Sequence, residues 1–473
     1  MSLGTFFIMR HELLLTAVAL LVLIAEIFWN PEKKKQITLF AVVLFGAITL
    51  AGFLPSPSGM LFGGMYVTSG TILLMKNILN IGVLLVFIQS LTWLQKEENN
   101  EKISEYFILL ISTLIGMNFM ISAGHFLMFY IGLELATIPI AALAAFERYK
   151  NKSAEAGIKL ILSSALSTGI LLYGLSMIYG TTGSLYFNEV ASHFGNANLM
   201  VLGFIFFFSG MAFKISLVPF HLWTADVYEG SPVNITSYLS VISKGAAVFI
   251  LMIILFTVFP VIIATWQKTI YVTAVLTMTI GNLFAIRQQN LKRFLAFSSI
   301  SQAGYILLGF IGGNQLGMVS VIYYVLVYIF SNLGAFGVVI AISNQTGKEN
   351  MDDYNGLYHS NPKLSLIMTL ALFSLAGIPP VAGFFGKFFL FTAAAQKGFY
   401  LLVLIAVLNT IISLYYYLLI VKAMFISKNE SPILKFKSDS PTRFALGICV
   451  AGIFITGFAS IIFEFIRNLS YGV

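Results

Sequence analysis

The sequence contains little of what most cofactor chemistry requires. Its 473 residues include a single cysteine, Cys449, so the chain alone can form no disulfide, zinc knuckle or iron–sulfur cluster. No Gly-x-Gly and no Walker loop occurs, which removes the usual fingerprints of dinucleotide and nucleoside triphosphate binding. The five histidines are too scattered to suggest a haem pair. We therefore expect no cofactor and no metal in this chain.

Charged residues are also scarce, at 10%, whereas hydrophobic residues make up 58% of the chain. These proportions lie far outside those of soluble domains and indicate a chain that lies mostly in a lipid bilayer. The formal net charge of +8 could suggest a nucleic-acid partner, but the basic residues lie in short loops, where membrane topology explains them better. We expect the bilayer, and no nucleic acid, as a partner.

Apolar segments of about 20 residues, the length that crosses a bilayer, occur fourteen times. They cover roughly 8–29, 36–54, 76–95, 105–123, 125–146, 155–180, 199–226, 232–259, 266–286, 293–312, 317–343, 363–395, 399–426 and 443–467. Gly, Ser and Pro are frequent at 55–75 and predict a small surface hairpin. The predicted fold class is an all-α polytopic membrane protein.

Basic residues are distributed unevenly between the loops. With the N-terminus outside, 17 lie in inner loops, beginning with Lys33–Lys35, and five lie on the outer side: Arg10, Lys76, Lys268, Lys397 and Arg467. This bias predicts that both termini face outward. The five other basic residues are lysines within the spans, where each would cost about 3 kcal/mol at a helix centre.

These five lysines differ in their surroundings. Lys422 lies near a helix end, so its side chain can reach the membrane interface. Lys159 is less than two turns from a loop, so both a position at the interface and a functional role stay open for it. Lys244 lies in mid-span near two serines, which favours a functional role. Lys214 is followed by Pro219, which must kink or break the helix because it has no N–H to donate.

The second proline site repeats this pattern. Pro379 and Pro380 free the carbonyls of Leu375 and Ala376, and Lys387 follows within two turns. Inside a membrane, freed backbone groups survive only where protein or a water-filled cavity satisfies them. Both breaks therefore predict polar, functional sites.

Glu134 is the only carboxylate deep in an early span. A carboxylate or a lysine buried alone becomes neutral, whereas a buried pair keeps both groups charged. Pairing Glu134 with Lys214 is therefore the least costly arrangement that the sequence offers. His221, Asp226 and Glu229 follow the first break and extend a polar path.

The proline-broken spans are the seventh and twelfth, five spans apart. This spacing predicts two inverted five-helix repeats, spans 4–8 and 9–13, as in transporters. The expected division is residues 1–104 (three helices), 105–259 (first repeat), 260–426 (second repeat) and 427–473 (C-terminal loop and helix).

Several motifs carry a family resemblance. FKISLVPFHLWTADVYEGSPVNIT at 213–236 closely resembles the signature of the antiporter-like membrane subunits of respiratory complex I (NADH–quinone oxidoreductase), and its Asp-Val-Tyr-x-Gly form resembles the subunit N group. GLELATIP around Glu134, RQQNLKRFLAFSSISQAGY at 287–305 and GIPPVAGFFGKF around Lys387 are similar to further family motifs. Ala225 and Ser231 depart from it, standing where the family usually has proline and alanine.

The resemblance implies a proton-translocating subunit driven by quinone reduction in other subunits, with no redox centre of its own. NAD, FMN, iron–sulfur clusters and quinone are then expected in partner subunits, and subunits M, K and their neighbours as membrane-arm partners. The implied location is the bacterial inner membrane, with both termini on the periplasmic side. In the implied proton relay, Glu134 and Lys214 form an ion pair, Lys244 is the central lysine and Lys387 is the outlet lysine. Lys159 and His221 are secondary residues of the same relay.

Two other functions stay open. A subunit of a multisubunit cation/proton antiporter shares the fold and many of the motifs, and co-purification with redox subunits would distinguish the two. A membrane scaffold without transport is the other, although the four charged positions within the spans argue against it.

Overall fold

A computed structural model of the chain describes residues 6–29, 34–193, 197–429 and 432–469. Two compact units are formed: unit 1 comprises Met1–Lys214, Ile242–Thr265 and Leu469–Val473, and unit 2 comprises Ile215–Val241 and Trp266–Asn468. The predicted division after residues 104, 259 and 426 stays a prediction, as do the inverted repeats. Lys33 and both termini lie outside the described residues.

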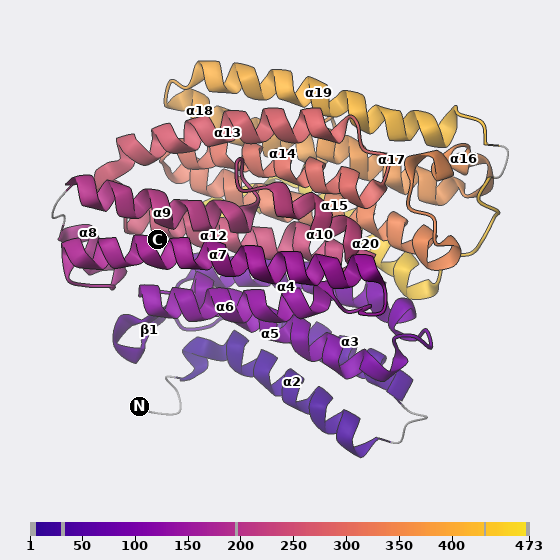
Figure 1. Cartoon of the computed structure of the whole chain (residues 1–473), viewed down its shortest axis with the longest axis horizontal. Helices are drawn as coiled ribbons and strands as arrows, with labels where there is room; N and C mark the ends of the chain where they lie inside the picture. The colour runs from indigo at the N-terminus through magenta and orange to yellow at the C-terminus, as the bar shows by residue number, and fades with distance from the viewer. Residues whose placement is uncertain (1–5, 30–33, 194–196, 430–431, 470–473) are drawn as a thin grey trace. The chain divides into compact units, whose positions relative to one another are not determined.

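Unit 1 is built from helices and one antiparallel hairpin, in which Gly59 pairs with Thr68. Its elements are α2 (Arg10–Phe28), α3 (Lys34–Ala51), β1 (Gly59–Leu61), β2 (Tyr66–Thr68), α4 (Gly70–Leu94), α5 (Ile103–Ile121), α6 (Phe126–Ala144), α7 (Asn151–Thr182), α8 (Phe187–Ser192), α9 (Ala197–Ile215, ending at the unit boundary) and α12 (Lys244–Thr257). Helix α5 packs on α2, α3 and α6, and α2 also packs on α3. These helices are the indigo to violet ribbons in Figure 1.

The regular secondary structure of unit 2 is helical, and its described residues include no strand. Its helices are α10 (Leu222–Gly230), α11 (Val233–Tyr238), α13 (Ile263–Ala285, beginning at the unit boundary), α14 (Leu291–Ile311), α15 (Gln315–Thr346), α16 (Leu357–Ser360), α17 (Pro362–Ala376), α18 (Ala382–Gln396), α19 (Tyr400–Phe425), α20 (Ser440–Phe458) and α21 (Ser460–Leu469). A π-helical turn at Leu239–Ser243 crosses a unit boundary. Short 3-10 turns occur at Phe7–Met9, Phe62–Gly64, Asn100–Lys102, Pro260–Ile262 and Met351–Tyr354.

The helices confirm an all-α polytopic membrane protein. Among the described residues, twelve helical segments are long and apolar enough to cross a membrane, and two shorter apolar helices lie at Lys35–Ala51 and Pro362–Ala376. The total of fourteen spans stays a prediction. One expected span, 443–467, is not continuous, because α20 ends at Phe458 and the separate, strongly amphipathic α21 begins at Ser460. The predicted hairpin is present, although α4 already begins at Gly70 rather than near residue 76.

Local sequence signals explain where several helices begin and end. Side chains of Ser69, Asn290, Asn314 and Asp439 accept hydrogen bonds from backbone N–H groups in the first turns of α4, α14, α15 and α20. Such caps satisfy donors that a helix cannot pair internally. Gly377 ends α17 in the left-handed region at φ +86°, a conformation that costs glycine least.

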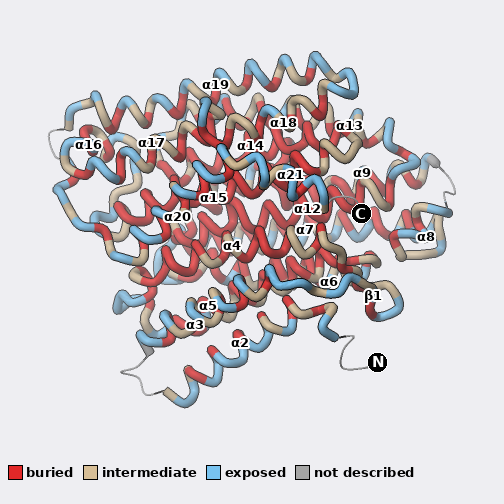
Figure 2. Tube along the Cα trace, turned by 180° about the vertical axis from the view of Figure 1, so that it is seen from behind, coloured by how far each residue is buried: buried red, intermediate tan, exposed pale blue. Residues whose placement is uncertain are grey.

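The core of unit 2 surrounds α15, which packs on α11, α14, α17, α18 and α20. The apolar windows of α14 and α15 are completely buried inside the protein. By contrast, only a third of the α19 window is buried, and its tube alternates between buried and exposed colours (Figure 2). A helix that is apolar all round belongs in such an interior, whereas α19 presents one face to lipid.

Candidate functional site

The prolines break both helices as predicted. α9 ends at Ile215, four residues before Pro219, and α10 begins only at Leu222. Pro379 and Pro380 lie between the end of α17 at Ala376 and the start of α18. The peptide bonds preceding Pro219 and Pro380 are cis. Each break lies close to a lysine that the sequence analysis selected.

Lys214 occupies the last turn of α9 and is 9% exposed. Its Nζ donates a hydrogen bond of 2.7 Å to Oγ1 of Thr137 on α6, and that hydroxyl donates to the carbonyl of Leu133. Glu134 is half-buried on α6, three residues before Thr137, a spacing that puts the two side chains on neighbouring positions of one helix face. The structure therefore brings Lys214 to the Glu134 face of α6 through Thr137, while a direct Glu134–Lys214 ion pair stays a prediction.

Close backbone contact between α5 and α6 positions Glu134. A Cβ atom on Gly132 would lie 2.6 Å from the backbone nitrogen of Met120, and one on Gly116 would lie 2.5 Å from that of Ala136. The two glycines therefore let the helices approach more closely than larger residues permit. This contact fixes the depth of the α6 turn that carries Glu134 and Thr137.

Lys244 is the first residue of α12, directly after the π-helical turn. Its side chain is 5% exposed, and the flanking residues Ser243 and Gly245 are also buried. π-turns are uncommon and frequently occur at functional sites. Lys244, Lys214 and Glu134 all belong to unit 1.

Lys387 lies in unit 2, on α18, and is 3% exposed. Its Nζ donates a hydrogen bond of 3.1 Å to the carbonyl of Ala376, the group that Pro380 frees. The carbonyl of Leu375, freed by Pro379, accepts from Nε2 of Gln302 at 2.9 Å. Side chains thus satisfy both carbonyls of the second break, as backbone groups inside a membrane require.

Buried tyrosines and amides surround Lys387. Its Nζ lies 4.3 Å from the ring centroid of Tyr305, and the Tyr305 hydroxyl accepts from Nδ2 of Asn282 at 3.4 Å. Tyr416 in turn donates to Oδ1 of Asn282 at 2.9 Å. Gln302 donates to the hydroxyl of Tyr417 and accepts from Tyr324. This network was not predicted from the sequence; its signal there is a series of Tyr, Asn and Gln within apolar spans.

The remaining lysines of the spans lie at more exposed positions. Lys159 pairs with Glu155 at 2.7 Å on α7, and its side chain is 42% exposed. Lys422 is exposed in the last turn of α19. His221, in contrast, is 5% exposed at the residue that precedes α10. The structure thus leaves Lys159 on an outer face of unit 1 and His221 inside unit 2.

The acids after the first break hold α10 against α14. Arg293 binds Asp226 at 2.7 Å and Glu229 at 3.2 Å through Nη1. The neighbouring Lys292 contacts Glu349 at 3.0 Å and donates to the carbonyl of Ser231. All side chains of the Arg293 group are partly exposed. We interpret Asp226 and Glu229 as anchors of α10 and not as a continuation of the lysine path.

The predicted outer-loop position of Lys76 is wrong. Lys76 is completely buried on α4 and its Nζ lies 2.6 Å from Oε1 of Glu12 on α2. The physical reason is that Glu12 lies 64 residues away, so the local pattern gives no sign of the pair. When Lys76 is left out of the count, 17 basic residues lie in the predicted inner loops and four on the predicted outer side. This asymmetry still favours the predicted orientation.

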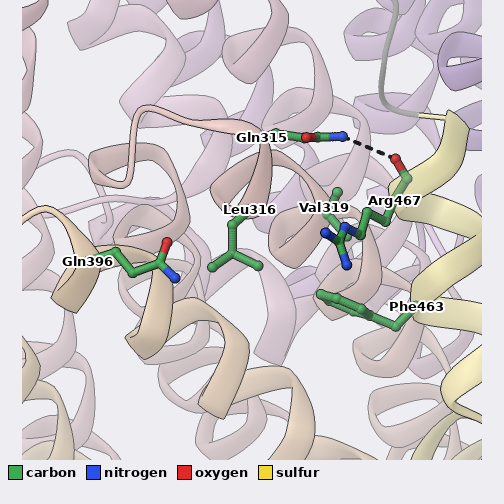
Figure 3. Close-up of a pocket in the computed structure, with 6 residues that line it drawn as sticks. All are labelled: Gln315, Leu316, Val319, Gln396, Phe463 and Arg467. Atoms are coloured by element: carbon green, nitrogen blue, oxygen red, sulfur yellow. Dashed lines mark hydrogen bonds between the residues drawn. The ribbon is translucent and has the colours of Figure 1, made fainter.

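Each unit has a cavity among its described residues. In unit 2, a cavity of about 320 Å³ lies between the start of α15 and α21 (Figure 3), where Gln315 donates to the carbonyl of Arg467. In unit 1, a cavity of about 590 Å³ lies at the hairpin and the end of α12. Across the described residues, no three His, Cys, Asp or Glu side chains are grouped as metal ligands would be.

Known proteins are similar to this chain in sequence and in fold. Residues 123–413 match the profile of the family described as NADH:quinone oxidoreductase/Mrp antiporter, TM. NADH-quinone oxidoreductase subunit N of Phocaeicola vulgatus is 54% identical over 461 residues, covering 97% of this chain and 98% of that protein. Subunit N of Azobacteroides pseudotrichonymphae is 50% identical over 477 residues, with coverages of 100% and 99%.

Solved structures agree in fold. A chain of respiratory complex I from Thermus thermophilus, solved with bound aureothin, matches with a TM-score of 0.79 and 26% identity over 96% of this chain and 98% of that chain. A chain of the Mrp complex from Dietzia matches with a TM-score of 0.86, covering 99% and 97%, but at 19% identity it shows the fold alone.

Broken helices, buried lysines and the family profile define an antiporter-like membrane subunit. Within that class, the full-length identities are decisive, and the chain belongs to the family of NADH-quinone oxidoreductase subunit N. It is a multi-pass membrane protein of the respiratory complex I type and has membrane-arm partners.

Proposed function

We propose that this chain translocates protons in the membrane arm of an NADH–quinone oxidoreductase, driven by quinone reduction in other subunits. The observation that carries the proposal is the burial of Lys214, Lys244 and Lys387, which are at most 9% exposed and each lie beside a helix break or a π-turn. Ionisable groups inside a membrane are costly, and where they are retained they mark ion pathways.

The proposed relay uses Glu134 and Lys214 as its switch, Lys244 as its central site and Lys387 as its outlet, with Lys159 and His221 as secondary residues. A proton that reaches Glu134 removes its negative charge. The ammonium of Lys214 then loses its nearby carboxylate and keeps Thr137, so its proton is more easily passed on. Water at the helix breaks, together with buried hydroxyl and amide groups, would connect sites that do not touch.

The assembly follows from the same proposal. Subunits M, K and their neighbours would cover parts of the apolar surface, and NAD, FMN, iron–sulfur clusters and quinone would be bound by partner subunits. We propose the bacterial inner membrane as the location, with both termini periplasmic. The family profile also names Mrp antiporters, but the full-length identities of 50% and above are to subunit N proteins. We therefore propose the complex I function.

The test compares Lys244→Arg with Lys244→Ala in the assembled complex. Guanidinium stays charged and does not release a proton at working pH. We expect both variants to lose most NADH-driven proton uptake into inverted membrane vesicles, because the relay needs a group that titrates. Full proton uptake by an assembled Lys244→Arg complex would contradict the proposed relay. Assembly is checked by co-purification of the other subunits.

A further inference from the structure

Unit 1 contains a second buried charge cluster, formed by Glu12 on α2, Lys76 on α4 and Tyr66 on β2. Nζ of Lys76 contacts Oε1 of Glu12 at 2.6 Å and donates to the Tyr66 hydroxyl at 2.9 Å. That hydroxyl donates to Oε2 of Glu12 at 2.9 Å. None of the three residues is more than 2% exposed. A buried ion pair is an expensive way to gain stability, since an apolar pair of similar size often serves equally well.

Buried amides continue from this cluster. Asn80 lies one turn further along α4, and Asn118 lies on the neighbouring α5; both are completely buried. Neither the amide nitrogen nor the amide oxygen of either residue has a hydrogen-bond partner within the described part of the chain. Leaving such groups unpaired in a protein interior is unfavourable. Buried polar groups of this kind are normally satisfied by ordered water.

The polar groups occur at successive depths. Val67 donates to the Ser122 carbonyl, so the start of α4 and the end of α5 lie at one end of unit 1. With a rise of about 1.5 Å per residue, Asn118 lies about 5 Å from the end of α5, and Lys76 and Asn80 lie about 9 Å and about 15 Å from the start of α4. Lys244 lies about 20 Å from the end of α12 by the same rise, and α12 packs on both α4 and α5.

The cavity of about 590 Å³ lies at this end of unit 1. Val67, Ser69 and Thr257 line it, together with Glu189. Side chains of a strand alternate between its faces, so Val67 of β2 borders the cavity while Tyr66 and Thr68 turn to the buried side, where they are 0% and 2% exposed. Thr68 Oγ1 has no partner among the described residues. The single strand β2 therefore separates the cavity from the charge cluster.

We propose that unit 1 carries an additional, hydrated proton path from Lys244 through Asn80 to the Glu12–Lys76–Tyr66 cluster and on, past Asn118, to the hairpin cavity. The inference rests on the proposed function, in which Lys244 transfers protons. A proton that reaches the carboxylate of Glu12 forms a carboxylic acid. Lys76 then releases a proton toward the cavity and takes the proton of Glu12 across their 2.6 Å contact, which restores the ion pair.

Hydration is tested without reference to pumping. In the assembled complex with Cys449→Ala, Asn80→Cys is treated with a small water-soluble methanethiosulfonate reagent. Leu79→Cys is the matched control, because Leu79 is equally buried on the same helix but is apolar. We expect Asn80→Cys to react at least tenfold faster than Leu79→Cys. Equal, slow reaction at both positions overturns the path, even where Lys244 proves to be a relay.

Proton transfer is tested with Asn80→Leu, which keeps the side-chain size but removes the groups that hold water. We expect the ratio of proton uptake to NADH oxidation in vesicles to fall at least twofold. Asn77→Leu is the control, since Asn77 bonds to protein through His11 and the Gly52 carbonyl and its loss should leave that ratio unchanged. If Asn80 is hydrated but Asn80→Leu leaves the ratio unchanged, the additional path is overturned and the proposed function is not. Normal proton pumping by Lys244→Arg overturns the proposed function.

Discussion

Thr137 offers the sharpest single test of how the first switch is built. Its hydroxyl donates to the Leu133 carbonyl and accepts from Lys214 at 2.7 Å, so Thr137→Val removes the contact while keeping nearly the same shape. Hydrogen bonds to charged groups contribute about 1.5–3 kcal/mol. Since about 1.4 kcal/mol is a factor of ten, the ammonium should occupy this position about ten to about a hundred times less often.

The consequence is measured as the ratio of proton uptake to NADH oxidation in inverted vesicles. We expect Thr137→Val to lower that ratio severalfold in a complex that still assembles, because Lys214 is no longer held at the face of α6 that carries Glu134. Thr137→Ser is the matched control, since it keeps the hydroxyl and should retain most of the activity. Equal proton uptake by Thr137→Val and wild type, in assembled complexes, would refute the positioning role of Thr137.

Three further predictions concern stability, measured by thermal denaturation of the purified complex. Gly116→Ala should destabilise by about 1–3 kcal/mol through the contact with the α6 backbone, whereas Gly169→Ala, which meets no atom within 4 Å, should be neutral or stabilising; equal effects would contradict the close α5–α6 contact. Gln302→Leu leaves the Leu375 carbonyl unpaired and should cost about 1–3 kcal/mol; an unchanged melting temperature would show that the break does not need this bond. Burial lowers the pKa of the His125 ring below its usual 6.5, although Glu189 opposes the shift. The stability that neutral His125 contributes to the folded protein is therefore complete above about pH 6.5 and is lost as the pH falls toward the lowered pKa. His125→Asn, which can still cap α6, should remove this part of the pH dependence of the melting temperature. An identical pH profile in the variant and the wild type would contradict the assignment.

Features set by covalent chemistry could be predicted from the sequence. Proline has no N–H, so the break at Pro219 and the freed carbonyl of Ala376 follow from the residue type alone. Even the group that satisfies this carbonyl, Lys387, is the first polar side chain that follows the break in the sequence.

Features that depend on distant partners could not be predicted. Lys76 looked like a loop residue because its partner Glu12 is 64 residues away. Thr137 was missed because a threonine in an apolar helix usually bonds only to its own backbone, and its contact with Lys214 spans 77 residues. The break between α20 and α21 was missed because it falls at Ala459, and alanine is the residue that most favours helix.

The contact between Lys387 and Ala376 has a consequence for the direction of transfer. The carbonyl belongs to the C-terminal end of α17, where aligned peptide dipoles leave a partial negative charge. That charge is a property of the backbone, and no proton can remove it. Glu134, by contrast, loses its charge whenever it is protonated. In the proposed relay, Lys214 therefore has a negative neighbour whose charge protonation removes, whereas the negative neighbour of Lys387 is permanent. The two ends of the path are not interchangeable, and a proton meets different conditions in each direction.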